Sequence, residues 1–272
     1  MLEVRILGCG SSGGVPRLGG KDGTGYWGVC DPANPRNRRS RCSILLRQKN
    51  GQGETNVLVD TSPDMRLQLL EARVTRLDGV LITHGHADQL HGMDDLRVLV
   101  LHNRAKIDVW TDHGAMKDVM QKFGYCFHQP PGSDYPVILN GHEIPEPFAP
   151  FPIHGPGGPL MVEAFGQRHG HIRSLGFRSG PVAYSPDADH LDEAAFDALK
   201  GVECWIVDAL RPTPHPSHAH LDRALEWIAR VKPRHAILTN MHVDMDYGTL
   251  KRTLPPGIEP AFDGMTVTFS QA

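Results

Sequence analysis

The stretch "GVLITHGHADQLHGMDD", residues 79–95, combines a short apolar run with three histidines and three aspartates. The apolar part predicts a strand that ends at Thr83, and His84 and His86 follow two residues apart. Alternate side chains of an extended chain share a face, so both imidazoles can reach one ion. Asp88 comes next, where the chain can turn into a helix. This H-x-H-x-D pattern at a strand end predicts a metal site, against the alternative of a polar turn with chance histidines.

The other polar residues of the stretch fit different tasks. Asp94 and Asp95 are expected to cap and charge the start of a helix over residues 93–105 rather than to bind metal. Gln89 occupies a position where a further nitrogen ligand would be expected, and the role of His91 stays open.

Length and composition predict one globular domain over residues 1–272, with 40% hydrophobic and 22% charged residues. A net charge of −3 gives no general attraction to nucleic acid or to an anionic membrane, so neither is expected as a partner. The five cysteines form no C-x-x-C pair, and no signal peptide or apolar run of about 20 residues is present. These features predict a cytoplasmic protein, and they are compatible with a homodimer.

Short runs rich in Val, Ile and Leu predict strands throughout the chain, with helices between them. Several runs are apolar on both faces, which predicts covered sheets with helices outside. The predicted strands are "LEVRIL", "CSILLR", "NVLVD", "GVLIT", "IDVW", "LMVEAF", "SLGFR", "PVAYS", "CWIVD", "HAILT" and "MTVTFS". Helices are predicted in "SPDMRLQLLEA", in "DHGAMKDVMQKFG" ending on its glycine, and in "HLDRALEWIARVKP".

Two glycine-rich segments need separate treatment. Residues 125–160 are dense in Pro and Gly and predict a long ordered loop. "GCGSSG", residues 8–13, matches a dinucleotide-binding pattern, but "GVPRLGGKDGTG" follows it and cannot form the helix that such a site requires. We interpret the segment as a tight turn, or as a floor in which Ser11 and Ser12 contact a substrate.

Further ligands are expected where later apolar strands end. "EAFGQRHGHIRS" supplies His169 and His171, "VAYSPDAD" supplies Asp187 and Asp189, and "HAILTNMHVDMD" supplies Asn240 and His242. Each polar cluster follows a strand, so these groups can converge on one sheet edge. "PTPHPSHAHLD" adds His215, His218 and His220, for which loop or helix-start positions are the competing interpretation.

The order of these motifs over nearly the whole chain resembles the metallo-β-lactamase superfamily. The markers are the opening glycine loop, "NVLVDTSPD" with Asp60, "THGHADQ", "QRHGHIRSLGF", the aspartate after "VAYS", and "AILT". "GCGSSGGVP", "RRSRCS", "PSHAHLD" and "PAFDGM" resemble the branch that contains the phosphoribosyl 1,2-cyclic phosphate phosphodiesterase. The resemblance implies a four-layer αββα sandwich, in the α+β or α/β class, with a metal site at one edge of the sheets.

The resemblance also implies residue roles. His84, His86 and His169 would bind a first ion, Asp88 a second, and Asp187 would bridge the two. Asp60 would orient the metal-binding loop, and His218 would contact the scissile phosphate or protonate the leaving group, which makes His218 and Asp88 the expected catalytic residues.

Three departures from the family pattern affect this expectation. Gln89 replaces an imidazole, and Asn240 stands where a histidine of the second ion is common, so both are expected to support the site and His242 is a substitute ligand. Amide oxygens bind zinc more weakly than imidazole, which predicts one intact position and one that is weakened or filled by Mn²⁺. The early loop retains only Cys30, so no structural zinc is expected.

The expected function is therefore a hydrolase that uses Zn²⁺, Mn²⁺ or both. It would cleave a small cyclic or nucleotide-like phosphodiester by a metal-activated hydroxide. One alternative is another hydrolase on the same scaffold, such as a tRNA 3′-processing nuclease or a thioester- or lactam-cleaving enzyme, with "RNRRSR", residues 36–41, contacting RNA. A second is a metal- or nucleotide-binding protein without catalysis.

Overall fold

The computed structural model describes residues 1–129 and 131–270, which divide into two compact units. The first unit contains Met1–Leu7, Ser43–Val162 and the segment from Thr266. The second contains Gly8–Cys42 and Glu163–Met265. The expectation of a single domain over the whole chain remains a prediction.

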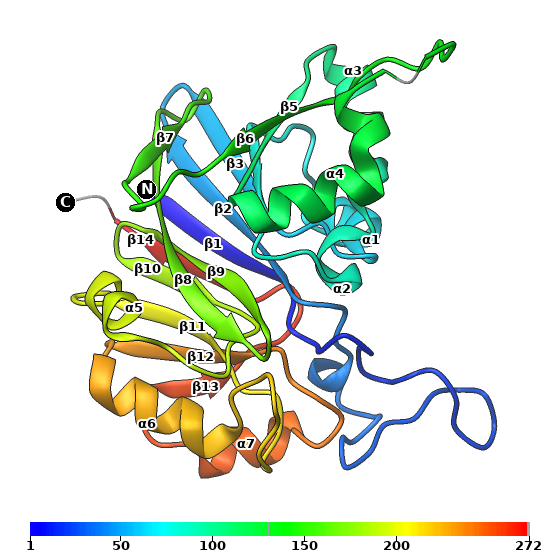
Figure 1. Ribbon diagram of the computed structural model, residues 1–272. Coiled ribbons are helices and arrows are strands. Elements are labelled where there is room, and N and C mark those ends of the chain that lie inside the picture. The colour runs from blue at the N-terminus through cyan, green and yellow to red at the C-terminus, as the bar shows by residue number, and fades with distance from the viewer. Residues whose placement is uncertain (130, 271–272) are drawn as a thin grey trace. The chain divides into compact units, whose positions relative to one another are not determined.

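The first unit is built on a seven-stranded sheet with the order β14-β1-β2-β3-β4-β5-β6 (Figure 1). Strands β3 to β6 run parallel, whereas β1 pairs antiparallel with β14 and β2 with β3. Polar residues that follow β3, β4 and β5 therefore gather at one edge of this sheet. The strands are β1 (Leu2–Gly8), β2 (Ser43–Asn50), β3 (Gly53–Val59), β4 (Gly79–Leu81), β5 (Ile107–Thr111), β6 (Leu139–Glu143) and β14 (Thr266–Phe269).

Helices of the first unit cover one face of its sheet. Leu58, Val80 and Val109 from the strands form a buried cluster with Met65 of α1 and Val119 of α4. This contact buries the apolar stripe of each helix, which is the main source of its stability. The helices are α1 (Met65–Glu71), α2 (Ala87–Leu90), η2 (Met93–Asp95), α3 (Leu96–Asn103) and α4 (His113–Phe127).

The second sheet has the order β13-β12-β11-β10-β9-β8-β7, with β10 to β13 parallel and β7 to β10 antiparallel. β10 and β11 are buried along their whole length, as their apolar sequences predict. The strands are β7 (Phe151–Ile153), β8 (Leu160–His169), β9 (Ile172–Ser179), β10 (Val182–Ser185), β11 (Cys204–Asp208), β12 (His235–Thr239) and β13 (Ile258–Pro260). The helices of the second unit are η1 (Pro35–Asn37), α5 (Glu193–Ala198), α6 (Leu221–Val231) and α7 (Tyr247–Thr253).

Every strand predicted from the sequence is present, but three local predictions differ from the structure. Residues 125–160 are not only a loop, because they contain β6 and β7 and the last turn of α4. The helix expected to stop at Gly124 continues to Phe127 through non-helical backbone at Phe123. Asp95 precedes α3 without a side-chain cap bond, and Asp94 instead accepts from Arg97 Nη2 at 2.7 Å.

Candidate metal centre

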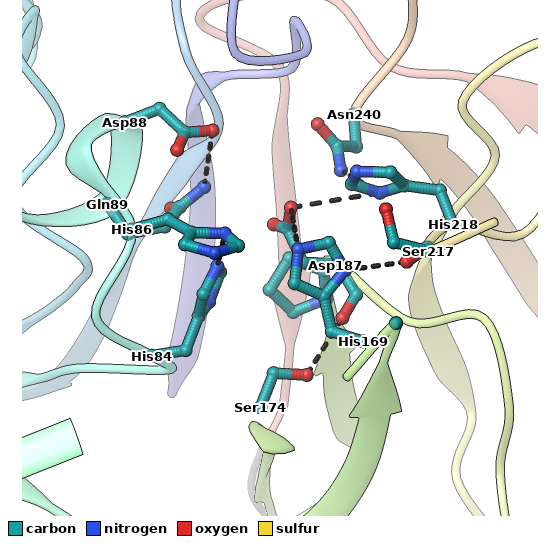
Figure 2. A network of polar contacts seen from close by, with 12 residues as sticks. His84, His86, Asp88, Gln89, His169, Ser174, Asp187, Ser217, His218 and Asn240 are labelled. Carbon is teal, nitrogen blue, oxygen red and sulfur yellow. Dashed lines mark hydrogen bonds and ion pairs between the residues drawn. The ribbon is translucent and has the colours of Figure 1, made fainter. Parts of the chain in front are cut away.

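In the first unit, His84 and His86 occupy the turn between β4 and α2 (Figure 2). His84 Nε2 lies 3.0 Å from His86 Nδ1. Two ring nitrogens at this separation either share a proton or face a common cation. Two imidazole ligands on a tetrahedral zinc ion stand about 3.3 Å apart, so the pair fits one ion.

Asp60 orients this pair through Thr83. The Asp60 carboxylate accepts from Thr83 N at 2.8 Å and from Thr83 Oγ1 at 3.0 Å, and Thr83 Oγ1 lies 3.0 Å from His84 Nδ1. A hydroxyl that donates to the carboxylate must accept from the imidazole, so Nδ1 of His84 carries the proton. Nε2 then carries the lone pair that can bind a metal. Asp60 adopts a left-handed φ of 65° directly after β3, a strain typical of functional sites.

Helix α4 packs against the turn that carries His84 and His86. A Cβ atom on Gly85 would lie 2.1 Å from Asp118 Oδ2. Lys122 Nζ of the same helix donates to the Gly85 carbonyl. Glycine between the two histidines is therefore required by close packing, and the turn cannot shift without moving α4.

Asp88 lies in the first turn of α2, and its neighbour Gln89 is fully buried. Gln89 Nε2 donates to Asp88 Oδ2 at 3.2 Å, and the Gln89 carbonyl accepts from Thr61 N at 2.8 Å. Gln89 thus contacts Asp88 and ties α2 to the loop after β3.

The second unit brings together His169, Asp187 and His218 from three separate segments (Figure 2). One ligand atom from each lies within 4.8 Å of the others. Asp187 Oδ1 is 4.0 Å from His169 Nε2 and 3.8 Å from His218 Nδ1. The Asp187 carbonyl accepts from Ser174 Oγ at 2.8 Å, which anchors its left-handed backbone of φ 48°.

The two imidazoles of this group are held in different ways. His169 Nδ1 lies 2.6 Å from the Ser217 carbonyl, so it carries a proton and leaves Nε2 facing Asp187. His218 Nδ1 lies 2.9 Å from Asp208 Oδ2, and a carboxylate is the stronger acceptor. Nδ1 of His218 therefore donates to Asp208 and cannot bind an ion, so Nε2 is the nitrogen through which His218 can act on a substrate.

Two carboxylates are buried in this group. Burial raises the pKa of Asp187, and the charge of Asp208 adds to the rise, although the charges of His218 and His169 oppose it. Asp208 is 0% exposed, and within the described residues its Oδ1 has no hydrogen-bond partner. Buried carboxylates need compensating positive charge. The residues present therefore fit a divalent cation.

Asn240 and His242 follow β12. Asn240 has a left-handed φ of 60°, and its Nδ2 lies 3.2 Å from His218 Nδ1. His242 Nδ1 lies 2.8 Å from Asp244 Oδ2, outside the group of His169, Asp187 and His218. A ligand role for His242 remains a prediction.

The glycine turn lies along the same part of the second unit. Gly10 forms bridges with Arg41 and Met241, and no helix follows it among residues 11–34, as predicted. Ser11 is buried and Ser12 exposed, and a substrate contact for either remains a prediction.

Two further polar residues lie near the candidate ligands in the sequence, Asp189 and His215. Asp189 accepts from Arg168 and from Gly170 N at 2.9 Å, so Arg168 has a carboxylate partner. Burial and the charge of nearby His218 lower the pKa of His215 to about 4.

Two residues of the site were missed from the sequence. Asp208 ends "CWIVD", and the rule that selected Asp187 and Asn240, a polar residue at the carboxyl end of a parallel strand, would also have found it. Thr83 gave no such signal, because a threonine at a strand end is common.

The family model of the beta-lactamase superfamily domain matches residues 55–241. The chain belongs to this superfamily. The crystal structure of a diphosphatase from the PhnP family matches with a TM-score of 0.85 and 28% identity, over 99% of this chain and 98% of that one. The αββα fold class and the resemblance to the phosphodiesterase branch of the metallo-β-lactamase superfamily are confirmed.

Two curated relatives are named neither as phosphodiesterases nor as diphosphatases. An octanoyltransferase of Porphyromonas gingivalis is 29% identical over 97% of this chain, but the chain spans only 51% of its length. A coenzyme PQQ synthesis protein B of Pseudomonas paraeruginosa is 22% identical over 98% of this chain and 99% of its own. The superfamily match and the diphosphatase likeness indicate a hydrolase. In the described part of the chain, no helix is long and apolar enough to cross a bilayer.

Proposed function

We propose that the chain is a metal-dependent phosphodiesterase that acts on a small cyclic or nucleotide-like phosphodiester. The proposed metal ligands are His84, His86 and Asp88 in the first unit, and His169 and Asp187 in the second. The observation that carries the proposal is the orientation of His218 by buried Asp208, beside the oriented candidate ligand His169. The superfamily match and the diphosphatase likeness support it.

A bound Zn²⁺ or Mn²⁺ ion would lower the pKa of water toward about 7 and neutralise charge on the phosphoryl oxygens. The chain's own residues supply the remaining chemistry. Asp208 holds His218 with Nδ1 protonated, so Nε2 can contact a phosphoryl oxygen or, when protonated, donate to the leaving oxygen. Asp60 and Thr83 hold the tautomer of His84, as the Ser217 carbonyl does for His169.

The test is a panel of phosphate esters assayed with Zn²⁺, Mn²⁺ and Mg²⁺. The panel contains cyclic phosphodiesters, linear phosphodiesters including bis-p-nitrophenyl phosphate, and nucleoside diphosphate esters. Turnover of cyclic or linear phosphodiesters is expected, and it should be lost in His84→Ala. The diphosphate esters test the second candidate, a diphosphatase, which the similarity to the PhnP-family enzyme favours. No hydrolysis of any ester by the metal-loaded protein would refute both and favour the non-catalytic binding protein.

A nuclease that binds RNA through "RNRRSR" is less well supported. Arg39 is 2% exposed and donates to the Met245 carbonyl at 2.6 Å. Arg36 lies over the rings of Tyr247 and Phe262, and Arg38 over that of Trp27. Arg39 therefore serves an internal contact, while Arg36 and Arg38 are exposed but stack on rings of the same chain. An RNA affinity that falls steeply with salt would restore the nuclease.

A further inference from the structure

Cys42 lies at the end of the loop before β2, 1% exposed, with its thiol beside the ligand group of the second unit. Its Sγ is 4.0 Å from Asp187 Oδ2 and 3.7 Å from Asn240 Oδ1. Neither the family pattern nor the sequence motifs assign this cysteine to a metal. Its position beside a candidate metal ligand makes it the strongest unassigned donor in the unit.

The two oxygens of Asp187 face different partners. Oδ1 is the oxygen nearest His169 Nε2 and His218 Nδ1, at 4.0 and 3.8 Å, whereas Oδ2 approaches Cys42. A carboxylate whose oxygens face separate sets of donors is suited to serve two cations. The thiol and the Asn240 amide lie on the Oδ2 side.

The separations fit ligands of one ion. With zinc–sulfur bonds of about 2.3 Å and zinc–oxygen bonds of about 2.0–2.2 Å, tetrahedral ligands stand about 3.5–3.7 Å apart. The observed 3.7 and 4.0 Å lie within a few tenths of an ångström of that range. We propose that the Cys42 thiolate, with Asp187 Oδ2 and Asn240 Oδ1, binds a thiophilic divalent cation such as Zn²⁺ or Cd²⁺.

This inference rests on the proposed metal centre and changes the expectation for its second position. Two neutral amides, Gln89 and Asn240, predicted a weak site that prefers oxygen ligands. A thiolate supplies a full negative charge and a soft donor, which selects zinc over manganese and magnesium. Binding exchanges the thiol proton for the metal ion, so one proton is released to solvent for each ion bound.

The chain offers a matched control for this cysteine. Cys126 is also buried, and its Sγ donates to a carboxylate oxygen of Asp94 at 3.6 Å. In the described part of the chain, neither Cys126 nor its neighbour Asp94 belongs to the candidate ligand groups, whereas the neighbour of Cys42, Asp187, does. Cys126→Ser therefore removes a buried thiol–carboxylate contact without touching the proposed ligands.

The experiment titrates Cd²⁺ and Co²⁺ into the metal-free protein and follows thiolate-to-metal charge-transfer absorption. The band should saturate at one thiolate per chain in the wild type and in Cys126→Ser, and disappear in Cys42→Ser and Cys42→Ala. Circular dichroism checks that the variants fold. Cadmium-113 NMR of the wild type reports sulfur ligation independently of any variant.

The outcomes distinguish the role of Cys42 from the existence of the metal centre. A wild type that binds metal without a charge-transfer band, or a band that survives in folded Cys42→Ser, overturns the role of Cys42 and leaves the metal centre standing. A wild type that binds no divalent ion by equilibrium dialysis overturns both.

Discussion

The candidate ligands of the first unit lie between residues 84 and 88, whereas those of the second unit run from Cys42 through His169 and Asp187 to Asn240. In the first unit, two histidines meet because they are two residues apart on one turn. In the second, His169, Asp187 and His218 meet only because the strand order of the second sheet brings their segments together. Local spacing can thus define a pair of ligands, but a group with oriented tautomers depends on which strand ends are neighbours.

The largest expected effect comes from removing one candidate imidazole ligand from each unit. His84→Ala and His169→Ala should each reduce turnover to background and lower the metal bound per chain, because both are proposed metal ligands. Activity and metal analysis of the purified variants test this. Full metal content and turnover in His169→Ala would separate the second group from the centre.

The next effect concerns the histidine that the structure orients away from ion binding. His218→Ala should lower kcat by about 10²–10⁴, the usual contribution of a general acid, while metal content stays constant. Asp208→Asn should cost less, about 10–100-fold, as expected for a partner that orients another residue. Loss of metal in His218→Ala would move that residue into the ligand set.

For Asp208→Asn, the pH profile separates a positioning role from a structural one. The variant changes the tautomer preference of His218, so its kcat profile should shift, whereas a merely destabilised protein would keep the wild-type profile.

A third prediction sharpens the role of Gln89. In a Cys42→Ser background, which lacks the proposed thiolate, Gln89→His should increase the number of metal ions retained after dialysis, because an imidazole replaces a neutral amide beside Asp88. Metal analysis of Cys42→Ser with and without Gln89→His, prepared side by side, is the measurement. No gain in metal retention from Gln89→His in the Cys42→Ser background would refute a role for residue 89 in the second position.

Packing around Gly85 gives a smaller effect. Gly85→Ala should destabilise the protein by about 1–3 kcal/mol, because the new methyl group meets the Asp118 carboxylate of α4. Chemical denaturation measures the loss. Gly85→Ala in an Asp118→Ala background should recover part of it, and no recovery would show that Asp118 is not the obstacle.

The smallest effect concerns the framework of the second unit. Asp246 caps α7 through Thr249 N at 2.8 Å and accepts from Asn37 Nδ2 at 2.7 Å. Burial opposes its charge, but these hydrogen bonds outweigh it and lower the pKa of Asp246 to about 2. Asp246→Ala should cost about 1–2 kcal/mol at neutral pH.

The sign of its pH dependence follows from that lowered pKa. The stabilisation is fully present above the ordinary Asp pKa of about 4 and is lost as pH falls toward about 2. Denaturation of wild type and variant between these values should converge at the acid end. A difference that stays constant would contradict the lowered pKa.

The sequence by itself determined the strands, the superfamily and the histidine pair of the first unit. These features depend on period-two apolar runs and on H-x-H spacing, which are local properties of the chain. It did not reveal β6, β7 and β13, because their residues lie among prolines and glycines that usually mark loops.

Only the tertiary structure decided what lies around the second group of ligands. That Asp208 contacts His218, that Ser217 contacts His169, and that Cys42 approaches Asp187 depends on the pairing of β10, β11 and β12 and on the loops between them. Contacts between residues far apart in the chain are set by sheet order and close packing, which no short motif encodes.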